Sequence, residues 1–192
     1  MKKVISVLLL ACMLLTLTAC GSQPAAPATD PTAEATEAPA AETAEAEYKL
    51  GMGVSVSLDS SDTNKAQVDA TVTTVVTDSE GKIVLCRIDC AQNKMDVTGG
   101  QVDTAATYTT KRDLKYDYNM VKYGNAIAEW DAQAKAFADY TVGKTADEVM
   151  GLDTTTNAEG YQVSTDETLL ASCTMAIDGM QAAIATAVNN AR

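Results

Sequence analysis

Hydrophobic and polar positions alternate from Leu50 to Leu58. Met52, Val54, Val56 and Leu58 fall on one side, and glycine or serine falls on the other. Strict alternation over nine residues predicts a half-buried β-strand. The segments 66–77 and 82–92 are rich in valine and other β-formers, and the turn sequence Asp-Ser-Glu-Gly at 78–81 joins them, so together they predict a β-hairpin.

The second half of the chain changes to helical spacing. A stripe of apolar residues predicts a helix from about Asn125 to Thr141, which Gly143 ends. Thr145 and Glu148 have the spacing of a capping box and predict a short helix through Met150. Another strand is predicted at 102–108. The apolar stripe consists of Ile127, Trp130, Ala134, Phe137 and Ala138.

The C-terminal region predicts two helices separated by an extended segment. Ser164 with Glu167 suggests one helix to about Ala171, and Asp178 with Gln181 suggests the start of the last helix. One continuous helix over 166–191 is the alternative. We favour the break because Gly179 and the run Cys173-Thr174-Met175 weaken a continuous helix.

The first twenty residues have the plan of an export signal. Lys2 and Lys3 precede an apolar run from Val4 to Leu15, and Leu17-Thr18-Ala19-Cys20 follows it. The run is too short to span a bilayer and stay there. The closing tetrapeptide matches a bacterial lipobox, which predicts cleavage after residue 19 and acylation of Cys20. The alternative is plain secretion with Cys20 as a bystander.

Residues 21–47 after that cysteine consist almost entirely of alanine, proline, threonine and glutamate. They hold all four prolines of the chain and no basic residue. Such a composition lacks the apolar surface needed for a packed core, so the sequence predicts a tether from Cys20 to residue 47 and a folded domain over 48–192. Fully extended, the tether reaches at most roughly 90 Å. These features place the protein on the outer face of the cell membrane, anchored by lipid.

The charge and the residue types exclude several classes of function. The formal net charge of the whole chain is −12. Cleavage of the signal removes Lys2 and Lys3, so the net charge of the mature chain is near −14. This acidity argues against nucleic acid and against anionic lipid headgroups as partners, so the acyl group on Cys20 must provide the membrane contact. The chain has no histidine, which excludes Ser-His-Asp and Cys-His catalysis and histidine-based zinc or haem sites.

Three cysteines remain in the predicted domain: Cys86, Cys90 and Cys173. Cys86 and Cys90 lie four apart on one strand, where about 13 Å separates them, so they cannot form a disulfide with each other. The alternatives are buried free thiols, which we favour, one bridge to Cys173, or a three-thiolate metal or redox site. The alternation over 84–90 also places Val84, Cys86, Ile88 and Cys90 on one face.

Several stretches between Tyr48 and Arg192 resemble a repeat of secreted Gram-positive lipoproteins that is related to the FMN-binding domain. The resemblance implies an α+β fold, with an antiparallel sheet packed by an aromatic-rich helix and a C-terminal helix. The matching stretches are 81–84, 88–92, 110–114, 118–120, 129–134, 140–145 and 178–180.

In flavinylated members of that family, FMN is joined through its phosphate to a threonine just before the last helix, and Thr174 falls on this position. The resemblance thus implies FMN as a cofactor, with Thr174, Ser172, Cys173, Tyr118 and Trp130 as binding residues. The motif around Thr174 departs from the family pattern, since Ser172 replaces a glycine and Cys173 an alanine. The aromatic residues have helical spacing, so core packing is the alternative for them.

Two hypotheses of function follow from the sequence. The first is a lipid-anchored flavin carrier in envelope electron transfer, which would meet an envelope redox partner and need no acid or base of its own. The second is a surface lipoprotein that binds a partner or has a structural role without a cofactor. The altered acceptor motif favours the second hypothesis, and Thr174 favours the first.

Overall fold

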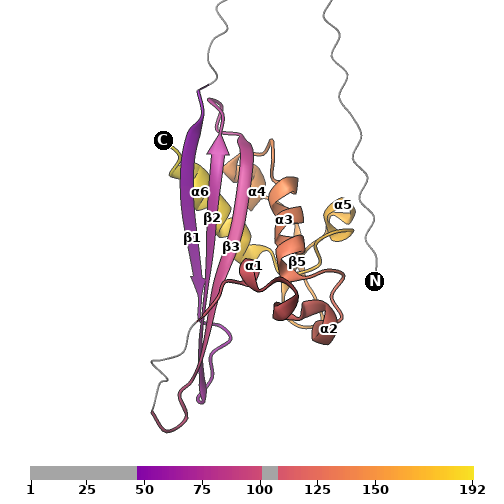
Figure 1. The fold of residues 1–192 in the computed structure, drawn as a ribbon. Coiled ribbons are helices and arrows are strands. Elements are labelled where there is room, and N and C mark those ends of the chain that lie inside the picture. Colours follow the sequence, from indigo (N-terminus) through magenta and orange to yellow (C-terminus); the bar gives the residue numbers. More distant parts are fainter. Residues whose placement is uncertain (1–46, 101–107) are drawn as a thin grey trace, which may run out of the picture. The chain divides into compact units, whose positions relative to one another are not determined.

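The structure is a computed structural model that describes residues 47–100 and 108–192. The signal, Cys20, nearly all of the tether and residues 102–107 of one predicted strand lie outside the described residues. Three strands form an antiparallel sheet in the order β1-β2-β3 (Figure 1). They are β1 (Lys49–Ser57), β2 (Lys65–Thr77) and β3 (Ile83–Asp96).

Helices cover one face of this sheet. The C-terminal helix α6 (Asp178–Asn189) packs on β1 and β2, and α3 (Trp130–Tyr140) packs on β3. In Figure 1, α6 crosses behind the strands. The predicted fold class is therefore confirmed: the domain is α+β, with an antiparallel sheet and helices. The remaining elements are η1 (Thr98–Gly100), α1 (Lys111–Leu114), η2 (Lys115–Tyr118), α2 (Met120–Gly124), α4 (Ala146–Met150), β4 (Thr154–Thr156), β5 (Gln162–Ser164) and α5 (Glu167–Leu170).

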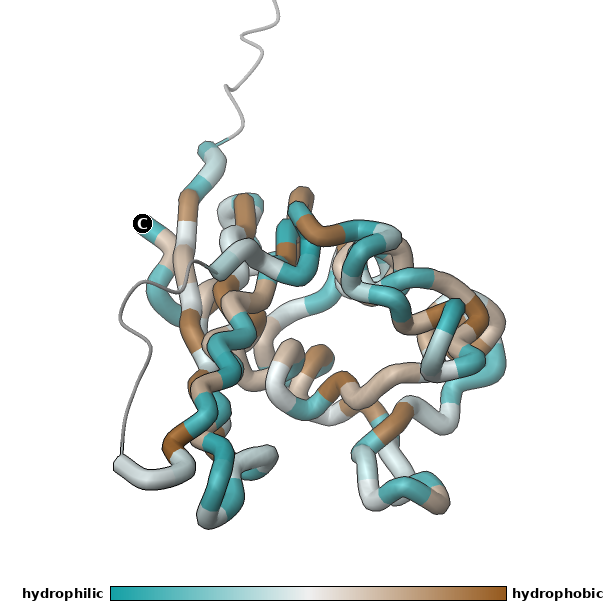
Figure 2. Tube along the Cα trace, turned by 60° about the horizontal axis from the view of Figure 1, so that its bottom comes forward, coloured by the Kyte–Doolittle hydropathy of each residue, from teal (hydrophilic) through white to brown (hydrophobic). Residues whose placement is uncertain are grey.

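β1 is half-buried, as the alternation predicted, but its buried side is the one without large side chains. Gly51 and Gly53 are buried against α6, and a Cβ at Gly53 would collide with the backbone of Ala183. The large apolar side chains point to the uncovered side of the sheet, and the pale and brown positions along β1 alternate in Figure 2. Glycine here allows the helix backbone to approach the strand closely.

The predicted hairpin is confirmed, with one change of register. A bulge at Val76 and Thr77 shifts the pairing, and Thr77 then faces Ile83. As a result, Ile83 is buried and Val84 is exposed. The prediction that Val84 shares the buried face is wrong, because a bulge reverses the alternation beyond it.

α3 begins at Trp130, five residues later than predicted from Asn125. Asn125 has a positive φ of 50°, which is incompatible with a helical start. Glu129, the last residue before the helix, instead accepts hydrogen bonds from the backbone N–H groups of Met120 and Val121. The aromatic stripe itself is buried as expected for core packing, although Ile127 lies outside the helix and is exposed.

The C-terminal break is confirmed, and the capping residues differ from the prediction. Asp166, rather than Ser164, caps α5, because its carboxylate accepts from the N–H groups of Thr168 and Leu169. Asp178 is the first residue of α6 and not its cap. The capping box of Thr145 and Glu148 at α4 is present.

Candidate functional site

A cleft of about 840 Å³ opens between the sheet and the segments that lead into α2, α3 and α6. Its floor comes from β2 and β3, on the side of the sheet that carries the helices. Three of the residues predicted from the sequence line it: Thr174, Tyr118 and Trp130. Other lining residues are Lys65, Gln67, Asp69, Thr71, Cys90, Gln92, Lys111, Met120, Asn125, Asp178 and Met180.

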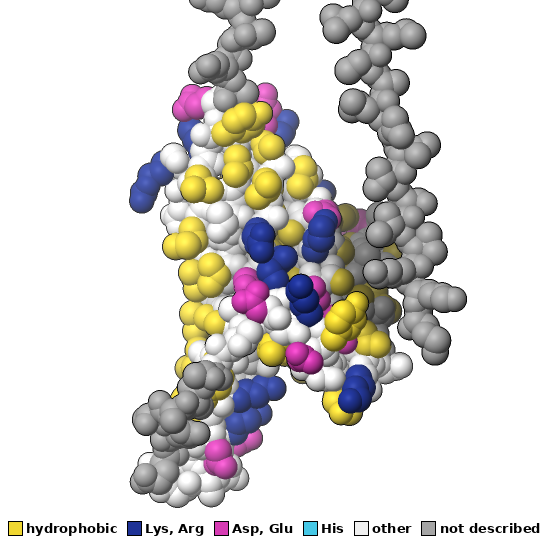
Figure 3. All heavy atoms as spheres, viewed as in Figure 1, with side chains coloured by type: hydrophobic (Ala, Val, Ile, Leu, Met, Phe, Trp, Pro, Cys, Tyr) yellow, Lys and Arg dark blue, Asp and Glu magenta, His cyan; other side chains and the backbone are white. Residues whose placement is uncertain are grey.

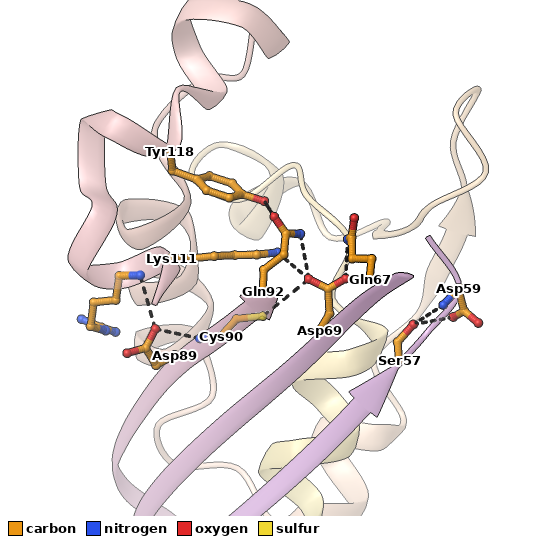
Figure 4. A network of polar contacts seen from close by, with 10 residues as sticks. Ser57, Asp59, Gln67, Asp69, Asp89, Cys90, Gln92, Lys111 and Tyr118 are labelled. Carbon is orange, nitrogen blue, oxygen red and sulfur yellow. Dashed lines mark hydrogen bonds and ion pairs between the residues drawn. The ribbon is translucent and has the colours of Figure 1, made fainter. Parts of the chain in front are cut away.

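Asp69 is the centre of a polar network in the floor of the cleft (Figure 4). Its carboxylate accepts hydrogen bonds from Gln67 Nε2 at 2.6 Å and from Gln92 Nε2 at 2.7 Å. Lys111 Nζ lies 3.5 Å from Asp69 Oδ1. The register pairs Asp69 directly with Gln92 across β2 and β3, which explains why these side chains meet.

The pairing of Asp69 with Lys111 favours the charged form of both side chains. Burial opposes ionisation of Asp69, but the hydrogen bonds from Gln67 and Gln92 and the charge of Lys111 outweigh it and lower the pKa of the carboxyl. Burial likewise opposes the charge on Lys111, and its neighbours Tyr118, Cys90 and Asp69 raise its pKa nonetheless. At neutral pH Asp69 is therefore a carboxylate and Lys111 an ammonium.

The ammonium of Lys111 also lies over two aromatic rings. It is 5.2 Å from the ring centroid of Tyr118 and 5.7 Å from that of Trp130. Both distances are within the range of a cation–π contact. The Tyr118 hydroxyl reaches Gln92 Oε1 at 3.4 Å. A planar ligand that enters along these rings would consequently meet Lys111.

Thr174 is far from the floor residues in the sequence, but it lines the same cleft. It is exposed, and its backbone N–H donates to Gln133 Oε1 at 2.9 Å. Gln133 is fully buried in α3, and its own Nε2 donates to the carbonyl of Ala128 at 2.7 Å. Gln133 thus holds the backbone of Thr174 in place, and the Thr174 hydroxyl donates to the same oxygen at 3.4 Å.

Ser172 and Cys173 do not line the cleft. The Ser172 hydroxyl turns back to the carbonyl of Leu169 at 3.3 Å. Cys173 is buried, and burial raises the pKa of its thiol to about 11. Of the five residues that the resemblance implied for cofactor binding, the cleft brings together three.

The cysteines of the domain are free, as the sequence analysis favoured. Burial raises the pKa of Cys86 to about 11 and also raises that of Cys90. Within 47–100 and 108–192, no cluster of cysteine, aspartate or glutamate has the geometry of a metal site.

Sequence reasoning missed the polar floor of the cleft. Gln67, Asp69 and Gln92 stand at strand positions that face the helices, where apolar residues are usual. Polar residues on the buried side of a predicted hairpin are the signal that would have found them. Lys111 lies in the stretch 110–114 of the family resemblance, which implies no role for it.

The domain is thus an α+β domain with a ligand-sized cleft whose floor is polar and whose wall is aromatic. A search for relatives among protein-family models, curated proteins and solved structures found none that matches the chain. Among the described helices, none combines the length and apolar character needed to cross a bilayer.

Proposed function

We propose that this chain is a lipid-anchored protein on the outer face of the cell membrane and that its cleft binds FMN. The convergence of Thr174, Tyr118 and Trp130 on one cleft is the observation that carries the proposal. These residues come from separate parts of the sequence, and the family resemblance selects them independently of the structure. The cleft volume of about 840 Å³ lies within the usual range for small-molecule sites.

The residues present suit the chemistry of a flavin nucleotide. Tyr118 and Trp130 offer aromatic surface to a planar ring system, although Trp130 is only 6% exposed and acts as a wall. Lys111 supplies a cation for the phosphate or for the polar edge of the ring. Thr174, which is exposed, adds a hydroxyl group four residues before the start of α6.

FMN supplies reversible electron transfer when it is bound, and the protein provides its position and surroundings. Lys111 and Asp69 would keep one charge of each sign beside the ligand. The proposal needs no catalytic acid or base from the chain, in keeping with the absence of histidine. A flavin carrier tethered outside the membrane would exchange electrons with an envelope redox partner.

The single tryptophan of the chain provides the test, because Trp130 lines the cleft. We expect FMN to quench tryptophan fluorescence of the purified full chain in a saturable way. Riboflavin, which lacks the phosphate, should bind at least tenfold more weakly than FMN. Lack of saturable quenching up to millimolar FMN would contradict the proposal and favour the cofactor-free surface lipoprotein.

Variants separate the roles of the cleft residues. Lys111→Gln should weaken FMN binding by about tenfold, the loss expected for one hydrogen bond to a charged group. Thr155→Ala, on exposed β4 and outside the cleft, is the control variant and should leave the affinity for FMN unchanged. Equal affinities of Lys111→Gln and the unaltered chain would remove Lys111 from the proposed site.

Covalent attachment of FMN to Thr174 is tested by a separate experiment. The chain is produced together with a flavin transferase, and the product is examined by denaturing gel fluorescence and by mass spectrometry. A gain equal to FMN that Thr174→Val abolishes would show that the cofactor is attached there. An unmodified Thr174 peptide restricts the proposal to non-covalent binding.

The membrane anchor is tested at Cys20. The mature N-terminal peptide should begin with this cysteine and carry a diacylglyceryl group. Cys20→Ser should release the protein from the membrane fraction. Recovery of uncleaved, unacylated chain from the cells that naturally produce it would contradict the proposed location.

A further inference from the structure

The polar floor of the cleft lies on the side of the sheet where apolar residues are usual. Antiparallel sheets commonly pack an apolar face on the core and turn a polar face to solvent. Here the open side carries hydrophobic side chains down the edge of the molecule where β1 runs (Figure 3). Gln67, Asp69 and Gln92 lie instead on the side that carries the helices. This inversion favours a role for the three polar side chains in binding a ligand.

Asp69 fixes which way the two glutamine amides point. An ionised carboxylate accepts hydrogen bonds and cannot donate them. The Nε2 groups of Gln67 and Gln92 therefore turn toward it, at 2.6 and 2.7 Å. The amide oxygens are then directed away from Asp69, as Figure 4 shows for Gln67. Gln92 Oε1 accepts from the Tyr118 hydroxyl at 3.4 Å.

Gln67 Oε1 is an acceptor that has no hydrogen-bond partner among the described residues. The Gln67 side chain is only 5% exposed, and it lines the cleft. Leaving a buried acceptor unpaired is costly, and buried polar groups in folded proteins are nearly always paired. A ligand that brings an N–H group to this point of the floor would satisfy the Gln67 oxygen.

Hydrogen-bond donors stand beside this acceptor. Lys111 Nζ is 3.5 Å from Asp69 Oδ1 and carries three N–H bonds, so it can serve the carboxylate and a ligand together. Gln92 Nε2 has a second N–H besides the one that donates to Asp69. Because all three side chains contact the same carboxylate, the acceptor and the donors are neighbours in the floor.

We propose that Gln67, Lys111 and Gln92 recognise a cyclic imide, the N–H group between two carbonyls that the pyrimidine ring of FMN presents. The imide N–H donates to Gln67 Oε1, and the flanking carbonyls accept from Lys111 and Gln92. The inference rests on the proposed function and specifies which end of the flavin enters the floor. The dimethylbenzene end of the ring system then points away from β2 and β3.

A flavin analogue tests the imide contact without any change to the chain. In N3-methyl-FMN a methyl group replaces the imide hydrogen. We expect the full chain to bind it about tenfold more weakly than FMN, because the analogue lacks the donor and leaves Gln67 Oε1 unpaired. Quenching of Trp130 fluorescence measures both affinities. Equal affinities for FMN and N3-methyl-FMN would overturn the inference and leave the proposed function standing.

Two pyrimidine nucleotides test the same contact apart from flavin. Uridine 5′-monophosphate presents an imide N–H between two carbonyls, whereas cytidine 5′-monophosphate presents a bare ring nitrogen that would face the Gln67 oxygen. We expect the uridine nucleotide to bind about tenfold more tightly, measured by the NMR shift of the single tryptophan indole N–H. That preference in a chain that does not bind FMN would support the imide contact and refute the flavin. Equal binding of both nucleotides, or no binding of any of the four ligands, would overturn the inference.

A variant tests the role of Gln67 itself. Gln67→Met keeps the length of the side chain and removes the acceptor, so it should abolish the difference between FMN and N3-methyl-FMN. Gln162→Met, on β5 and outside the cleft, is the matched control and should preserve that difference. Circular dichroism shows whether each variant is folded. An undiminished difference in folded Gln67→Met would exclude Gln67 as the imide acceptor.

Discussion

At the scale of single residues, Asp69 organises the floor of the cleft. Two amide side chains donate to its carboxylate, and Lys111 balances its charge. A half-buried charge such as that of Asp69 is stabilised by partners of this kind. The position of Lys111 over Tyr118 and Trp130 thus depends on a carboxylate that lies on a different element.

Asp69→Asn should change the pH dependence of stability. The pKa of Asp69 is lower in the folded chain than the unfolded value of about 3.9. Its ionisation therefore stabilises the fold above that value, and this stabilisation is lost as the pH falls through the folded pKa. The free energy of unfolding in urea should fall less between pH 6 and pH 3 in the variant.

Glu159→Gln is the control for that comparison, because Glu159 is an exposed carboxylate in a loop. At pH 7 we expect Asp69→Asn to be less stable by about 1–2 kcal/mol, the typical result of an imperfectly satisfied polar site. The same acid-induced loss in both variants and in the unaltered chain would show that Asp69 does not contribute.

The thiols should be almost unreactive in the folded protein. Burial raises the pKa of both Cys86 and Cys173 to about 11, so little thiolate exists at pH 8. An aromatic disulfide reagent should label the domain slowly in buffer and rapidly in denaturant. Fast labelling of either cysteine in the folded state would contradict the described packing.

At the scale of elements, the contact of β1 with α6 depends on the absence of side chains. Gly51 and Gly53 face backbone atoms of Ala183 and Ala187, so no rotamer could relieve an added methyl group. The large apolar residues of β1 are then left exposed on the other side of the strand. One local feature accounts for both the helix packing and the exposed surface.

Gly53→Ala should destabilise the fold by about 1–3 kcal/mol, the usual cost of overpacking, since α6 must move. Gly179→Ala in α6 is the control, because the nearest atom to its new Cβ is 4.0 Å away. Alanine favours helix, so Gly179→Ala should be neutral or stabilise by up to about 1 kcal/mol. Thermal unfolding compares the two, and an unchanged midpoint for Gly53→Ala would refute the close contact.

Element types were largely predictable from the sequence, and their exact packing was not. The alternation of apolar and polar residues predicted β1 and the hairpin. It did not predict that the glycine side of β1 is buried, because that burial depends on a helix more than 120 residues later. The bulge at Val76 likewise has no local signal. The late start of α3 follows from Glu129 binding the backbone at Met120, a contact between separate segments.

At the scale of the whole molecule, the sequence predicted the wall of the cleft better than its floor. Thr174, Tyr118 and Trp130 could be selected from a family resemblance, whereas Gln67, Asp69 and Gln92 meet only through strand register. Gln133, which holds Thr174, looked like an ordinary helix residue. Side chains that act through long-range contacts carry little signal in the sequence alone.

The last residue of the chain lies beside the first strand, since Arg192 pairs with Leu50. Ser60, Lys65 and Gln67, which line the cleft, lie beyond the other end of that strand, about 20 Å from Leu50 at the usual rise per residue. A fluorescent or affinity tag appended after Arg192 would consequently emerge at the end where the folded part begins and leave the mouth of the cleft unobstructed.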